Sequence, residues 1–70
     1  MEEIYRRLSE HKVTLEIRPI SDSDELIFEF TKDGRCRLVI VNAMDFKNYP
    51  NVTCGRLCDE INRVAALNNA

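Results

Sequence analysis

The sequence has little of what catalysis or phosphate binding requires. Among 70 residues there is one histidine, His11, and only two glycines. Gly34 and Gly55 are too far apart to belong to one glycine-rich phosphate loop. Adjacent carboxylates such as Asp59 and Glu60 point apart on a helix surface, so they do not form an acid–base pair. We therefore expect a protein that is not an enzyme and that uses no cofactor.

An excess of charge of one sign and a long apolar run are both absent. Ten Lys and Arg against twelve Asp and Glu give a net charge of -2, which argues against binding nucleic acid through bulk positive charge. The opening MEEIYRRLSEHK is charged from its second residue, and no long apolar run follows it. We expect neither a signal peptide nor a membrane span, and hence a cytoplasmic protein.

The three cysteines are an odd number without a secretory signal, which predicts free thiols. A structural zinc site needs four ligands, usually two closely spaced pairs, whereas beyond Cys54 and Cys58 only the isolated Cys36 and His11 remain. We therefore expect no metal. On a helix Cys54 and Cys58 share the apolar stripe of Leu57, Ile61 and Val64, so we expect them to be buried. The alternative for Cys54 is a reactive thiol near a helix N-terminus.

A chain of 70 residues is long enough for one domain, residues 1–70. The first half predicts a helix followed by a strand. Helix formers fill residues 2–10, with Ile4, Tyr5 and Leu8 at helical spacing. From residue 13 apolar and polar side chains alternate up to Pro19, as in a half-buried strand. The polar residues 21–25 predict a loop.

The stretch LIFEFTKDGRCRLVIV predicts a β-hairpin, because two β-rich runs flank Asp33 and Gly34. A two-residue turn would place Phe30 opposite Arg37. A three-residue loop, residues 32–34, separates apolar from charged side chains, and we predict this register. Its pairs are Thr31–Arg35, Phe30–Cys36, Glu29–Arg37 and Phe28–Leu38.

This register divides the sheet into a core face and an open face. The core face would carry Val13, Leu15, Ile17, Leu26, Phe28, Phe30, Cys36, Leu38 and Ile40. The open face would carry Ile27, Val39 and Val41 among charged residues. These three are either scattered surface hydrophobics or the centre of a partner interface, for which a second copy of the chain is the simplest partner.

The second half of the chain predicts a connector and a closing helix. In residues 43–49 we expect Phe46 and Tyr49 to cover the edge of the core. Pro50 suits a turn or a first helical position, and Asn51 or Thr53 suits an N-cap. The helix would end near Leu67, with residues 68–70 frayed. The predicted fold is α+β, αβββα, with a three-stranded antiparallel meander sheet and both helices on one face.

The order of these elements resembles that of double-stranded-RNA-binding domains. Where such domains usually carry a lysine cluster, at the start of the second helix, this chain has NYPNVTCGR, with only Arg56 and, upstream, Lys47. This resemblance implies an alternative function, a nucleic-acid-binding module. The residues that would serve it lie on or beside the hairpin: Arg18, Lys32, Arg35 and Arg37.

The opening MEEIYRRL, the strand KVTLEI, an acidic loop, a hairpin ending in TKDGR and a closing helix resemble short phage and prophage accessory proteins. Some of these are anti-CRISPR inhibitors, which cover the DNA-reading surface of a CRISPR nuclease with an acidic face. The resemblance implies a protein-binding inhibitor of a host defence system. The expected partner-binding residues are the acidic Asp22, Asp24, Glu25 and Asp33 and the apolar Ile27, Val39 and Val41.

Overall fold

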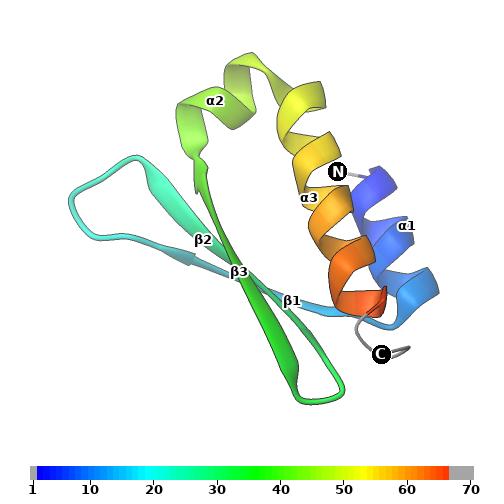
Figure 1. Ribbon diagram of the computed structural model, residues 1–70. Coiled ribbons are helices and arrows are strands. Elements are labelled where there is room, and N and C mark those ends of the chain that lie inside the picture. The colour runs from blue at the N-terminus through cyan, green and yellow to red at the C-terminus, as the bar shows by residue number, and fades with distance from the viewer. Residues whose placement is uncertain (1, 67–70) are drawn as a thin grey trace.

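The computed structural model describes residues 2–66. Within them, three strands form one antiparallel sheet in the order β1-β2-β3, which confirms the predicted α+β meander. The two longer helices lie on the same face of this sheet (Figure 1). The elements are α1 (Glu2–His11), β1 (Thr14–Pro19), β2 (Glu25–Lys32), β3 (Arg35–Asn42), α2 (Ala43–Asn48) and α3 (Pro50–Ala66).

Helix α1 ends in a tight reversal that leads directly into β1. Lys12 has a positive φ of 57°, and the N–H of Val13 donates to the carbonyl oxygen of Leu8 over 2.9 Å. A left-handed residue followed by such a bond is the Schellman arrangement, which satisfies carbonyls at the helix end. Leu8 and Val13 are both buried, so the reversal also closes one end of the core.

The β2–β3 hairpin has a two-residue turn, and the predicted three-residue register was wrong. Lys32 pairs with Arg35, and further along Phe30 is opposite Arg37. The turn residues Asp33 and Gly34 have φ values of 51° and 79°. Positive φ at both positions gives a turn whose twist matches the right-handed twist of the flanking strands, which favours this register.

The change of register exchanges the two faces of β3. Val39 and Val41, predicted to be exposed, are 5% and 1% exposed in the core. Cys36, Leu38 and Ile40, predicted to be in the core, are exposed. The charged residue that this register brings to the helix side, Arg37, is accommodated because its Nε lies 2.5 Å from a carboxylate oxygen of Glu60 on α3.

The core lies between the sheet and the pair of helices α1 and α3. Phe28 and Phe30 form its centre, with ring centroids 6.5 Å apart. Ile17 is on the same face of the sheet but 44% exposed, so its predicted place in the core was wrong. The buried apolar residues are Ile4, Leu8, Val13, Phe28, Phe30, Val39, Val41, Leu57, Cys58, Ile61 and Val64.

The segment predicted as a connector forms the short helix α2. Asn42 caps it, because its side-chain oxygen accepts hydrogen bonds from the backbone N–H of Met44 at 2.9 Å and of Asp45 at 3.1 Å. Phe46 covers the core edge as predicted, 6.3 Å from Phe28 between ring centroids. Tyr49 does not, because it is 64% exposed.

Helix α3 begins at Pro50, so of the two roles predicted for this proline it has the first helical position. Asn51 and Thr53 are therefore inside its first turn and are not N-caps. The predicted end at Leu67 and the fraying of residues 68–70 lie outside the described residues.

Candidate protein-interaction site

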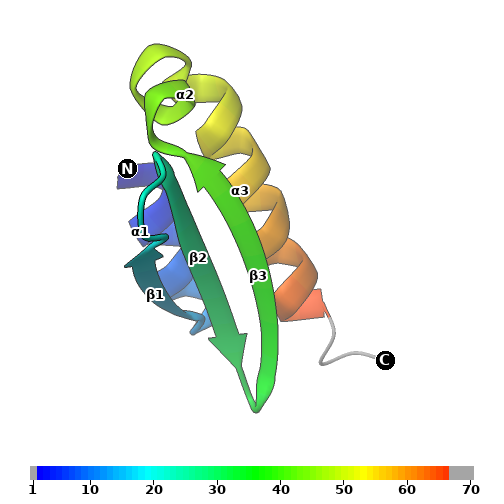
Figure 2. The ribbon, with the colours of Figure 1, turned by 90° about the vertical axis from the view of Figure 1, so that its left-hand side faces the viewer.

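We call the side of the sheet that faces away from α1 and α3 the outer face (Figure 2). Its apolar residues are Ile27 on β2 and Leu38 and Ile40 on β3, and the register places Ile27 opposite Ile40. Leu38 is 59% exposed and Ile40 is 50% exposed, while Ile27 is half-buried. These three neighbouring side chains leave an apolar strip in contact with solvent.

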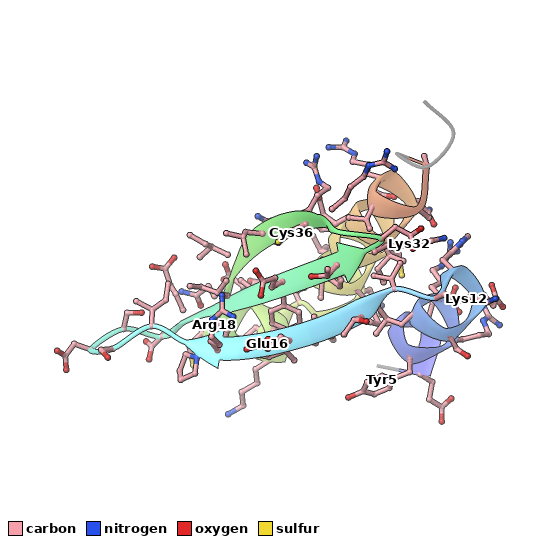
Figure 3. The ribbon with its side chains drawn as sticks, turned by 90° about the horizontal axis from the view of Figure 1, so that it is seen from below. Tyr5, Lys12, Glu16, Arg18, Lys32 and Cys36 are labelled. Atoms are coloured by element: carbon pink, nitrogen blue, oxygen red, sulfur yellow. The ribbon has the colours of Figure 1, made fainter. Side chains whose placement is uncertain are left out.

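Beside this strip, the outer face carries a network of polar side chains. A guanidinium nitrogen of Arg18 lies 3.1 Å from a carboxylate oxygen of Glu16 and 3.1 Å from one of Glu29. The thiol of Cys36 donates to the other oxygen of Glu29, also over 3.1 Å. Figure 3 shows Glu16 and Arg18 on β1, with Cys36 on β3. The apolar strip therefore has a charged border on its β1 side.

The hydrogen bonds of this network shift the pKa values of its members. The thiol of Cys36 and then the guanidinium of Arg18 lower the pKa of Glu29. The carboxylate of Glu29 in turn raises the pKa of the Cys36 thiol, because the bond favours the protonated thiol. Cys36 is thus exposed, but its environment disfavours the reactive thiolate.

The second feature of the site is the free edge of β3. Lys32 and Arg35 close a two-residue hairpin, so they form a hydrogen-bonded pair, and such pairs recur at every second residue. The backbone groups of Cys36, Leu38, Ile40 and Asn42 therefore point away from β2. We call these groups the β3 edge. Within residues 2–66, no hydrogen bond joins the outward groups of Leu38 or Ile40 to another element.

The opposite edge of the sheet, along β1, is less suited to pairing with another strand. The N–H of Ile20 donates to the carbonyl of Glu25, so the even-numbered residues of β1 face β2 and its odd-numbered residues face outward. One of these outward residues is Pro19, which has no N–H to donate. β3 contains no proline and pairs with β2 over all eight residues without a bulge.

A cavity of about 390 Å³ opens where β3 meets α2 and α3. Its charged lining residues are the acidic Asp45 and the basic Arg56. Its apolar wall includes the exposed side chains of Tyr49 and Val52. The complete lining is Val41, Asn42, Asp45, Tyr49, Val52, Thr53 and Arg56.

The predicted acidic residues do not form one surface. Asp22 and Asp24 are in the β1–β2 loop, and Glu25 begins β2, so these three lie at one end of the sheet. Asp33 is in the β2–β3 turn at the other end. The predicted apolar partner residues are also divided, because Ile27 is on the outer face whereas Val39 and Val41 are buried.

The basic residues of the nucleic-acid alternative are divided between the two faces of the sheet. Arg18 is on the outer face in contact with Glu16 and Glu29. Arg37 is on the helix side in contact with Glu60. Lys32 and Arg35, which flank the hairpin turn, are on the same side of the sheet as Arg37. Three of the four basic residues therefore lie together on the helix side, and Arg18 is apart from them on the outer face.

Of the three free cysteines, Cys58 is buried, Cys54 is partly buried and Cys36 is exposed, so the predicted burial was wrong for Cys36. Burial raises the pKa of the Cys58 thiol. Among residues 2–66, no three His, Cys, Asp or Glu side chains are grouped as a metal site would require.

The exposure of Leu38 and Ile40 and the free β3 edge were not predicted from the sequence. A signal for both was present, because Asp-Gly between two β-rich runs favours a two-residue turn. That turn assigns Val39 and Val41 to the core and leaves Leu38 and Ile40 outside. The charge of Arg37 obscured this signal, because its partner Glu60 is 23 residues away on α3.

The fold and this surface define a small α+β domain with an open sheet face and an open β3 edge. No family model, curated protein or solved structure matches the chain. Of the helices in residues 2–66, none has the length and apolar character that crossing a membrane would require.

Proposed function

We propose that this protein is a non-enzymatic binding module that contacts another protein through the outer face of its sheet. The observation that carries the proposal is the exposure of Leu38 and Ile40, 59% and 50%, on a face that neither α1 nor α3 covers. An apolar centre with charged residues at its border is typical of a protein interface. The Glu16, Arg18 and Glu29 network supplies such a border.

The proposal includes the cytoplasm as the setting, supported by three free cysteines, since thiols stay reduced there. It also includes a partner class, a host defence protein such as a CRISPR nuclease. Support for this class comes from the resemblance to phage accessory proteins and from the acidic residues Asp22, Asp24 and Glu25 at one end of the sheet.

The test compares two lysine substitutions at apolar residues. Ile27→Lys places a charge at the centre of the outer face, on the middle strand of the sheet. Tyr5→Lys is the matched control, because Tyr5 is 58% exposed on α1, away from the outer face (Figure 3). Tagged wild-type protein and both variants are used to capture partners by cross-linking in a lysate of the source cells.

We expect wild type and Tyr5→Lys to capture the same protein and Ile27→Lys to lose it. Circular dichroism confirms that each variant is folded. Undiminished capture by folded Ile27→Lys would show that the outer face is not the binding surface. Saturable binding of a labelled duplex that weakens steeply with salt would instead favour the nucleic-acid alternative.

A further inference from the structure

Edge strands of monomeric proteins usually carry devices that prevent pairing with another strand, such as short length, proline, a bulge or charged side chains. β1 has Pro19, but β3 has eight regularly paired residues without proline or bulge. The charged residues of β3, Arg35 and Arg37, are on the helix side, where Arg37 contacts Glu60. The exposed side chains on its outer side are Cys36, Leu38 and Ile40, none of them charged. We propose that the β3 edge binds the β3 edge of a second copy of this chain, antiparallel, in one six-stranded sheet.

The β3 edge is complementary to itself. A two-fold axis normal to the sheet keeps the outer faces of both copies on the same side. Around such an axis each residue of one β3 is opposite a residue of the other β3, and the two residue numbers always add to the same even number. All outward backbone groups of β3 belong to even-numbered residues, and therefore they meet only outward groups of the second copy. The two central registers, centred on Leu38 or on Val39, both bring Leu38 and Ile40 of the two copies into one apolar strip.

The charges at the two ends of β3 favour the antiparallel arrangement. At its C-terminal end, the carbonyl of Asp24 accepts a hydrogen bond from the N–H of Ala43 over 2.7 Å, and Asp45 follows in α2. At its N-terminal end, Lys32 and Arg35 flank the turn that contains Asp33. Antiparallel pairing places the more basic end of each copy beside the acidic end of the other, twice in the dimer.

The cavity at the end of β3 lies next to the edge at which a second copy would pair. Val41 lines the cavity, and its side chain is on the helix side of the sheet. In the register centred on Val39 the residue opposite Val41 is Arg37 of the second copy, and in the register centred on Leu38 it is Arg35. Both registers bring an arginine beside a cavity whose lining includes Asp45 and Tyr49 and also the basic Arg56.

This inference goes beyond the proposed function, because it concerns the backbone edge and needs no foreign partner. It also differs from a dimer through the sheet face. An edge dimer leaves the outer face open and joins the apolar strips of two copies into a wider surface for another protein.

The experiment measures the mass of the intact protein by sedimentation equilibrium over a range of concentrations. Leu38→Pro removes an outward N–H that no group in residues 2–66 accepts. Ile17→Pro is the matched control, since it removes an outward N–H from an exposed residue of the other edge strand. We expect wild type and Ile17→Pro to approach twice the monomer mass and folded Leu38→Pro to remain at the monomer mass.

Amide hydrogen exchange of the wild-type protein gives a second measurement that does not depend on a variant. We expect the amides of Leu38 and Ile40 to become protected as the concentration rises, while those of Arg37 and Val39 are protected throughout. A wild type that stays monomeric at millimolar concentration would overturn the proposal. So would a dimer that persists in Leu38→Pro but dissociates in Ile27→Lys, because that dimer would use the face.

Discussion

Position 34 is where the backbone conformation most clearly restricts which residue the sequence can have. Its φ is 79°, and a Cβ placed there would meet no atom within 4 Å, so only the backbone conformation opposes a substitution. We expect Gly34→Ala to lower the free energy of unfolding by about 1–2 kcal/mol. The control is Gly55→Ala in α3, which has equal space and helical φ and should raise stability by about 0.5–1 kcal/mol. Urea unfolding measures the change in the free energy of unfolding for both variants, and a change of the same sign in the two would contradict the assigned turn.

Cys36 is exposed, yet we expect its thiol to react slowly at neutral pH. The carboxylate of Glu29 raises the pKa of this thiol, so the thiolate forms only at higher pH. Glu29→Gln removes the carboxylate charge and should lower that pKa and speed labelling of Cys36 by a thiol reagent at pH 7. Glu16→Gln is the control, because Glu16 contacts Arg18 but not the thiol. An unchanged rate in Glu29→Gln would show that the carboxylate does not control the thiol.

At the scale of elements, the end of α1 contains a residue that its conformation disfavours. Lys12 has a φ of 57° in the position where helices usually have glycine. We expect Lys12→Gly to raise the free energy of unfolding by about 1 kcal/mol, because the strain of a left-handed residue is removed. Glu10→Gly, inside the same helix, should lower it by about 1 kcal/mol. Thermal melts of both variants measure the difference, and a loss of stability in Lys12→Gly would contradict the assigned reversal.

The β2–β3 hairpin is the element whose prediction depended on information outside itself. Its existence and its turn residues followed from two β-rich runs around Asp33 and Gly34. Its register did not, because both turn lengths are sterically possible for Asp-Gly. The two-residue turn placed the charged Arg37 opposite Phe30, and the three-residue loop left Ile27, Val39 and Val41 exposed. The contact that resolves the choice, between Arg37 and Glu60, joins the hairpin to α3.

At the scale of the whole molecule, carboxylates in ion pairs make stability depend on pH. The guanidinium groups of Arg6 and Arg7 lower the pKa of Glu3 below its ordinary value of 4.5. The thiol of Cys36 and the guanidinium of Arg18 do the same for Glu29. These two carboxylates therefore bind protons more weakly in the folded state than in the unfolded chain. Their contribution to the free energy of unfolding is complete above pH 4.5 and is lost as the pH falls through the lowered pKa values.

We expect the melting temperature to fall between pH 5 and pH 2 and to fall less in the double variant Glu3→Gln, Glu29→Gln. The variant should be less stable than wild type at pH 7 and close to it at pH 2. Parallel curves for the two proteins over this range would show that these carboxylates have no part in acid unfolding.

The order of elements and much of the core follow from the sequence by itself. Ile4 and Leu8 in α1, Phe28 and Phe30 in β2, and Leu57 and Ile61 in α3 are at spacings that direct them to one side of their own element. Because that periodicity is local, it identifies each helix and strand and its buried side without reference to the rest of the chain. The outer-face residue Ile27 could be placed in the same way.

The Asp-Gly turn favoured one face of β3, but the tertiary structure decided which face is buried, and with it the rest of the candidate site. Both faces of this strand carry apolar side chains, Val39 and Val41 on one and Leu38 and Ile40 on the other, so alternation alone does not choose between them. The choice was made by α3, which buries the two valines and provides Glu60 for Arg37. The exposed strip and the β3 edge are consequences of that packing, because a shift of one residue in register exchanges every side chain between the faces.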